Sequence, residues 1–230
     1  PRRSSGTRAV GATTDMSPAQ GLYQPRFEHD SCGVNFVCHL KGEASHRIVE
    51  LGLGALCRMQ HRGALGAEEN TGDGAGILLQ IPDAFYRQVL AFELPEAGAY
   101  ATGIAFLPGQ PEMADRAAAM VDEIALQEGM EVLGWRDLPI DDSTIGNAAR
   151  AAEPTFRQVF LAGSPGPEGR PSGIDLDRLA YVVRKRVEHE LRSGVEGSAS
   201  TVPDVYFPSL SARTIVYKGM LTNVQLAEFF

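Results

Sequence analysis

Cys32 is the residue of this 230-residue chain with the clearest potential for covalent chemistry, because of where it stands. It lies in Ser31-Cys32-Gly33, behind a polar stretch (residues 1–20) with no hydrophobic periodicity, which we expect to be disordered. A thiol attacks well only as a thiolate, and its free pKa of about 8.5 calls for a base nearby. No histidine can be assigned to that role from the sequence. A cysteine that begins a chain can instead use its own α-amino group, whose pKa is about 8.

Removal of residues 1–31 would make Cys32 such an N-terminal nucleophile. The alternative is a buried core residue, since free cysteines often serve as small hydrophobes. The residues alone leave both interpretations of Cys32 open, whereas for Cys38 and Cys57 we favour the core. Three cysteines without a C-x-x-C pair predict neither a disulfide framework nor a zinc site.

Gly72-Asp73-Gly74-Ala75-Gly76 looks like a phosphate-binding loop, but its context differs. A dinucleotide-binding loop follows a strand and opens a helix, whereas here a polar loop precedes the glycines and a strand follows. We therefore expect a tight turn with positive φ, or a close approach of two backbones. His61-Arg62-Gly63 stands at a predicted helix end with no second histidine at a metal-ligand spacing, so we predict no metal site.

The composition excludes several classes of protein. A net charge of −8 and a pI near 5.2 argue against a nucleic-acid partner, which needs a concentrated basic surface. No apolar run approaches the roughly 20 residues that cross a bilayer, and no secretory signal is evident. We expect a globular protein of the cytoplasm.

The elements that must position these residues alternate between helix and strand. We predict helices from Ser45 to before Gly63, over 83–90, 111–127 and 175–191, and one opened by the capping box Thr222-x-x-Gln225. Strands are predicted at 34–37, 77–81, 101–107, 131–135 and 155–161, with 205–210 and 213–217 as a hairpin-like pair. Interleaved helices and apolar strands indicate sheets covered by helices, an α/β or α+β architecture. Because the last helix stops after barely two turns, we expect the chain to be a fragment.

Three blocks carry a resemblance to the opening of glutamate synthase large subunits: GLYQPRFEHDSCGVNFV, MQHRGALGAEENTGDGAGILLQIP and SLSARTIVYKGMLT. The resemblance implies a class II glutamine amidotransferase in which residues 1–31 are a propeptide and 32–230 the N-terminal portion of the catalytic domain. It makes Cys32 the nucleophile. It also implies that Arg213 binds the carboxylate of glutamine, since a guanidinium can donate two parallel hydrogen bonds to that group. One departure is Asn35, where the family more often has a small residue.

For the fold, the resemblance implies α+β and the αββα four-layer sandwich of N-terminal-nucleophile hydrolases, incomplete at the C-terminus. For the reaction, it implies that ammonia leaves glutamine through a cysteine thioester and serves the reductive synthesis of glutamate from 2-oxoglutarate. The Asn-Gly oxyanion hole of the family should lie beyond Phe230, so we expect the chain alone to be inactive.

The resemblance places no cofactor in this chain and implies FMN and a 3Fe-4S cluster in the full-length protein. Electrons would come from NADPH through an FAD-containing small subunit, or from ferredoxin. Two alternatives stay open: another N-terminal-nucleophile amidohydrolase, or a non-catalytic interaction domain with a buried Cys32.

Overall fold

The computed structural model describes residues 33–60, 68, 70–72, 74–167, 169–191 and 204–230. The chain divides into two compact units, Pro1–Cys32 and Gly33–Phe230, and every described residue belongs to the second. Cys32, the predicted leader and His61-Arg62-Gly63 therefore lie outside the described residues.

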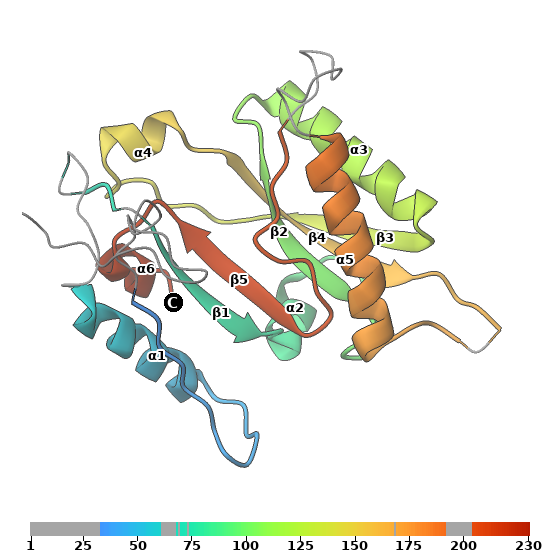
Figure 1. Ribbon diagram of the computed structural model, residues 1–230, viewed down its shortest axis with the longest axis horizontal. Coiled ribbons are helices and arrows are strands. Elements are labelled where there is room, and N and C mark those ends of the chain that lie inside the picture. The colour runs from blue at the N-terminus through green and yellow to red at the C-terminus, as the bar shows by residue number, and fades with distance from the viewer. Residues whose placement is uncertain (1–32, 61–67, 69, 73, 168, 192–203) are drawn as a thin grey trace, which may run out of the picture. The chain divides into compact units, whose positions relative to one another are not determined.

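Helices and strands alternate along most of the described chain, as the hydrophobic pattern predicts (Figure 1). The helices are α1 (His46–Arg58), α2 (Asp83–Val89), α3 (Pro111–Gln127), α4 (Asn147–Ala151), α5 (Gly173–Glu190) and α6 (Asn223–Glu228). The strands are β1 (Ala75–Gln80), β2 (Ala101–Leu107), β3 (Met130–Asp137), β4 (Thr155–Gly163) and β5 (Thr214–Gly219). The predicted capping box of α6 is present, with Thr222 Oγ1 accepting from the Gln225 N–H and Gln225 Oε1 from the Thr222 N–H.

The described strands form two antiparallel sheets, β1-β5 and β2-β4-β3. In the first sheet, Ala75 pairs with Gly219 at one end and Gln80 with Thr214 at the other. In the second, β4 is central and pairs with both neighbours. Antiparallel sheets with helices between their strands in sequence confirm the mixed class predicted for the chain.

Two hydrophobic clusters define how these elements are layered. One lies between the β2-β4-β3 sheet and the helices α3 and α5, which cover the same face (Figure 1). Its members alternate along β2 and recur at helical spacing in α3, where they include Ala114, Ala117, Val121 and Ile124. The other cluster lies between the two sheets and joins Ile104 and Phe160 to Ile215 of β5. The described order is thus helices, sheet, sheet, while α1 and α6 pack against each other and against β1.

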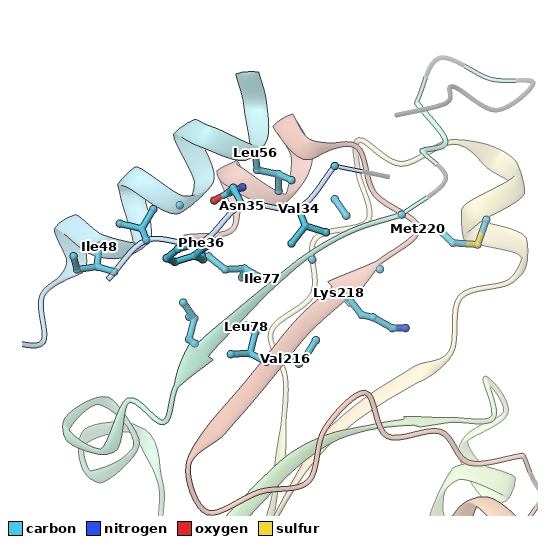
Figure 2. Close-up of a pocket in the computed structure, with 18 of the residues that line it drawn as sticks. Val34, Asn35, Phe36, Ile48, Leu56, Ile77, Leu78, Val216, Lys218 and Met220 are labelled. Carbon is cyan, nitrogen blue, oxygen red and sulfur yellow. The ribbon is translucent and has the colours of Figure 1, made fainter. Parts of the chain in front are cut away.

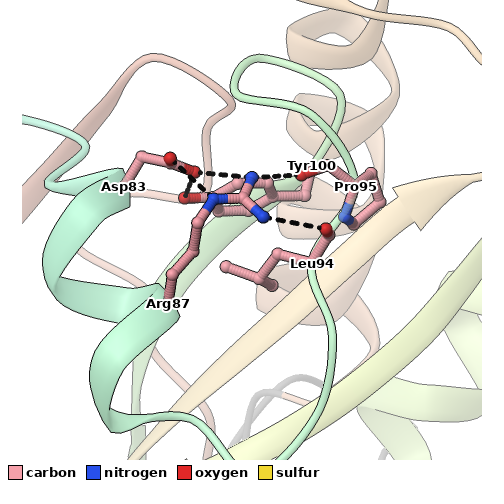
Figure 3. Close-up of polar contacts among 5 residues, drawn as sticks. All are labelled: Asp83, Arg87, Leu94, Pro95 and Tyr100. Atoms are coloured by element: carbon pink, nitrogen blue, oxygen red, sulfur yellow. Dashed lines mark hydrogen bonds and ion pairs between the residues drawn. The ribbon is translucent and has the colours of Figure 1, made fainter.

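A polar contact fixes α2 to the start of β2 (Figure 3). Asp83, the first residue of α2, accepts hydrogen bonds from Arg87 Nε at 2.8 Å and from the hydroxyl of Tyr100 at 3.0 Å. Arg87 also donates to the carbonyl of Leu94 at 3.1 Å, so one guanidinium joins the helix to the loop that returns to β2.

Two strand predictions are wrong. Residues 34–37 form no strand, because a strand needs a neighbour to pair its backbone groups, and none of the described segments provides one there. Residues 205–210 form no hairpin with β5 either; the segment instead makes isolated bridges to β2 at Tyr206 and Ser211. A side chain takes the place of a backbone partner there, since Ser209 Oγ accepts a hydrogen bond from the N–H of Val216 in β5 at 2.9 Å.

Two smaller differences concern α4 and the cysteines. The α4 helix was not predicted, since five residues are too few to show a helical period. The core interpretation of Cys38 is wrong because the residue is exposed, whereas Cys57 on α1 is partly buried.

Candidate active site

Gly33, which follows Cys32 in the chain, lines a hollow of about 920 Å³. Figure 2 shows the segment that carries Val34, Asn35 and Phe36 running between α1 and the β1-β5 sheet. The walls come from Ile48 and Leu56 of α1, Ile77 and Leu78 of β1, and Val216 and Lys218 of β5. The hollow is therefore bounded by segments that are far apart in sequence and that include all three blocks of the family resemblance.

The lining is largely apolar, and Lys218 is the one charged side chain among the described residues that form it. Its ammonium donates to the hydroxyl of Tyr206 at 2.8 Å and lies 4.6 Å from the centroid of that ring. The two contacts hold a cation at the wall of the hollow. Asn35 also lines the hollow and adds an amide to it.

The glycine-rich loop shapes one rim of the hollow, and it shows the positive φ and the close backbone approach that were expected. Gly74 has a φ of 132°, which side chains rarely allow. A Cβ on Gly72 would lie 2.4 Å from the carbonyl oxygen of Leu221, and one on Gly76 would lie 2.8 Å from Cβ of Lys218. The absence of side chains at these glycines thus lets the backbone at the start of β1 lie close to the end of β5 and the residues just after it.

Arg213 lies at the other end of β5. Its side chain is exposed, while its backbone carbonyl accepts from the N–H of Ile81 at 3.1 Å. Arg213 is not among the residues that line the hollow, although Val216, three residues further along the chain, is one of them. The structure does not bring Arg213 to the hollow beside Gly33, and its role in binding glutamine stays a prediction.

Within the described ranges, no group of three or more His, Cys, Asp and Glu residues is placed to hold a metal ion. Nor does that part of the chain contain a helix both long and apolar enough to cross a membrane.

Comparison with known proteins identifies relatives of the chain. The model of the family described as "Glutamine amidotransferases class-II" matches residues 32–230, so the match begins at Cys32. The NADPH-dependent glutamate synthase large chain of Bacillus subtilis is 42% identical over 216 residues, which are 94% of this chain and 14% of that protein. The NADH-dependent glutamate synthase of Schizosaccharomyces pombe is 38% identical over 220 residues, 94% of this chain and 10% of that protein. Ferredoxin-dependent glutamate synthase 2 of Synechocystis is 35% identical over 231 residues, 97% of this chain and 14% of that protein.

The chain thus spans 10% to 14% of the length of these three relatives. The family match covers the whole of the described unit and the cysteine that precedes it. The chain belongs to the class II glutamine amidotransferases.

Proposed function

We propose that the chain is the glutamine-hydrolysing part of a glutamate synthase, with Cys32 as its nucleophile. The observation that carries the proposal is that the family match begins at Cys32 while the next residue, Gly33, lines the hollow. Consecutive Cα atoms are about 3.8 Å apart, so a nucleophile at position 32 has its backbone within one residue of that hollow. We further propose that the two stacked sheets and the α3–α5 layer are part of the αββα sandwich of N-terminal-nucleophile hydrolases.

The proposed reaction begins when the sulfur of Cys32 attacks the side-chain amide carbon of glutamine. The α-amino group of Cys32 takes the thiol proton and passes it to the leaving nitrogen, so ammonia departs and a thioester remains. Water then releases glutamate and restores the thiol. An internal Cys32 has only an amide nitrogen, which is no base, so the proposal requires cleavage between Ser31 and Cys32.

Glutamine hydrolysis also requires a group that binds the carboxylate of the substrate. The resemblance gives that role to Arg213, whose side chain is exposed and is not among those that line the hollow. Arg213→Lys therefore makes a sharp test, because an ammonium cannot reproduce a bidentate fork. A raised KM for glutamine would support the assignment, and an unchanged KM would remove Arg213 from the site.

In the complete protein, we propose that the ammonia is used for reductive synthesis of glutamate from 2-oxoglutarate in the cytoplasm. FMN and a 3Fe-4S cluster would lie outside this chain. The relatives include NADPH-, NADH- and ferredoxin-dependent glutamate synthases, so we propose that the electron donor is NAD(P)H, through an FAD-containing subunit, or ferredoxin.

The test compares Cys32→Ala with Cys57→Ala in the complete protein. We expect Cys32→Ala to lower glutamine-dependent synthesis by about four orders of magnitude or more and to spare synthesis from added ammonia. Cys57, partly buried on α1, is the matched control and should retain both activities. Intact mass should show Cys32 as the first residue of the active enzyme. Normal use of glutamine by Cys32→Ala, or full activity with residues 27–31 still attached, would overturn the proposal.

A further inference from the structure

Glu68 connects two segments that are 80 residues apart in the chain. Its Oε2 atom accepts hydrogen bonds from Thr71 Oγ1 at 2.8 Å and from the N–H of Ala148 at 3.1 Å. Ala148 lies in the first turn of α4, where N–H groups have no partner within the helix. The bond from Ala148, and then that from Thr71, lowers the pKa of Glu68, so the group is a carboxylate at neutral pH.

The backbone at Asn70 is also held by hydrogen bonds, which come from Gly146 before α4 and from Gln225 in α6. The carbonyl of Asn70 accepts from the N–H of Gly146 at 3.0 Å and from Nε2 of Gln225 at 3.4 Å. A Cβ on Gly146 would lie 2.0 Å from Thr71 Oγ1 and 2.5 Å from Glu68 Oε2. The carboxylate therefore sits so close to α4 that a side chain at position 146 would push the side chains of Glu68 and Thr71 out of place.

This anchored segment leads directly into the glycine rim of the hollow. Gly72 lies against the carbonyl of Leu221, just beyond β5, and leaves no space for a side chain. Two residues later Gly74 lines the hollow together with Gly33. Any shift of residues 70–72 away from α4 would thus move the rim that faces the backbone next to Cys32.

We propose that Glu68 is a positioning residue for glutamine hydrolysis: its carboxylate joins Thr71 to the start of α4 and so holds the Gly74 rim of the hollow in place. The proposal rests on the proposed function at Cys32. Glu68 acts through the rim and takes no part in bond making. Because Oε2 alone accepts both hydrogen bonds, the carbonyl oxygen of a glutamine could replace it.

The experiment uses the complete protein and compares Glu68→Ala, Glu68→Gln and the control Glu93→Ala, which removes an exposed carboxylate from the loop between α2 and β2. We expect Glu68→Ala to lower kcat for glutamine-dependent ammonia release by on the order of 10- to 100-fold, as misplaced reacting groups do. Alkylation of Cys32 by a glutamine-mimicking diazoketone should slow in parallel. Synthesis from added ammonia should be unchanged, and Glu68→Gln should stay within about threefold of the wild type.

Gly146→Ala provides a second route to the same result should Glu68→Ala fold poorly, because its methyl group would press on the same contact from the α4 side. It should show the same selective loss of glutamine use. Normal kcat in both variants would overturn the proposal. So would an equal loss of ammonia-dependent synthesis, or a loss in Glu68→Gln as large as that in Glu68→Ala.

These outcomes are separable from failure of the proposed function. If Cys32→Ala uses glutamine normally, the function itself is wrong and the positioning role falls with it. If Cys32→Ala cannot use glutamine while Glu68→Ala and Gly146→Ala both use it normally, only the role of Glu68 is refuted.

Discussion

Gly103 of β2 is a residue where the fold leaves no room for a side chain. A Cβ there would lie 2.2 Å from the carbonyl oxygen of Ser209 and 3.2 Å from the Cα of Leu210. The bridges of β2 to Tyr206 and Ser211 flank this point, so the backbone of residues 204–212 passes directly over it. That segment leads into β5, and its path depends on a glycine in the neighbouring strand.

We predict that Gly103→Ala destabilises the protein by about 1–3 kcal/mol, because the methyl group must push the backbone of Ser209 away. Gly54→Ala is the matched control. It lies inside α1 with nothing within 4 Å of its Cβ position, and helix propensity favours alanine there by about 0.5–1 kcal/mol. Urea unfolding of the 230-residue chain at micromolar concentration, followed by the fluorescence of its single tryptophan, Trp135, measures the stability of both variants. Equal midpoints for Gly103→Ala and the wild type would refute the predicted clash.

Single residues differ in how far the sequence can reveal their roles. The glycine-rich loop is recognisable because glycines just before a strand indicate positive φ or close contact between backbones, and the structure shows both. Glu68 was not singled out, because its partner Ala148 is 80 residues away and its neighbours give no periodic signal. The same holds for Asp177, whose Oδ1 accepts from Ser211 Oγ at 2.9 Å across 34 residues. Polar contacts of this kind depend on the tertiary fold.

At the scale of the element, a segment is predictable where its buried residues follow the period of a helix or of a strand. The α3 and α5 helices bury a regular stripe on the β2-β4-β3 sheet, and β2 alternates between the two clusters. Residues 34–37 and 205–210 also contain several apolar side chains, but whether they become strands depends on which strand is available to pair with them. The sequence indicates whether a segment favours the strand conformation, but a strand forms only where the fold provides another strand to pair with it.

The contact between α2 and β2 predicts a pH dependence of stability. The hydrogen bond from Arg87 has the largest effect in lowering the pKa of Asp83, and that from Tyr100 adds to it (Figure 3). Burial, and then the hydrogen bond to Asp83, raises the pKa of Tyr100, which keeps its hydroxyl protonated as a donor. A carboxyl whose pKa is lower in the folded state stabilises the fold above its unfolded pKa of about 3.9.

We therefore predict that Asp83→Asn is less stable than the wild type at pH 7, because it loses the charged acceptor of Arg87 and Tyr100. The difference should shrink as the pH falls from about 5 through the folded pKa of Asp83, since the wild type then becomes protonated and loses the same contribution. Urea midpoints of both proteins between pH 7 and pH 3 provide the measurement. A difference that stays constant over this range would contradict the role given to the carboxylate.

For the Gly33–Phe230 unit as a whole, the two clusters show where its stability resides. The β2-β4-β3 sheet is covered on one face by α3 and α5 and on the other by the β1-β5 sheet. The hollow beside Gly33 is the contrasting region, because Val34, Phe36 and Leu78 are apolar and exposed there. The proposed chemistry thus lies beside an exposed apolar surface, next to a well-packed support.

This exposed apolar lining predicts how the 230-residue chain behaves on its own. Val34 is 85% and Phe36 89% exposed, and both border the hollow, so two chains can bury this surface against each other. We expect sedimentation velocity at tens of micromolar to give a mass that rises with concentration above 24.7 kDa. The double variant Val34→Ser with Phe36→Ser should sediment closer to 24.7 kDa. The control Leu126→Ser also replaces an exposed apolar side chain by serine, at a 71% exposed site on α3 outside the hollow, and should behave as the wild type. A wild-type chain that stays monomeric, or a Leu126→Ser variant as monomeric as the double variant, would show that the lining of the hollow does not drive association.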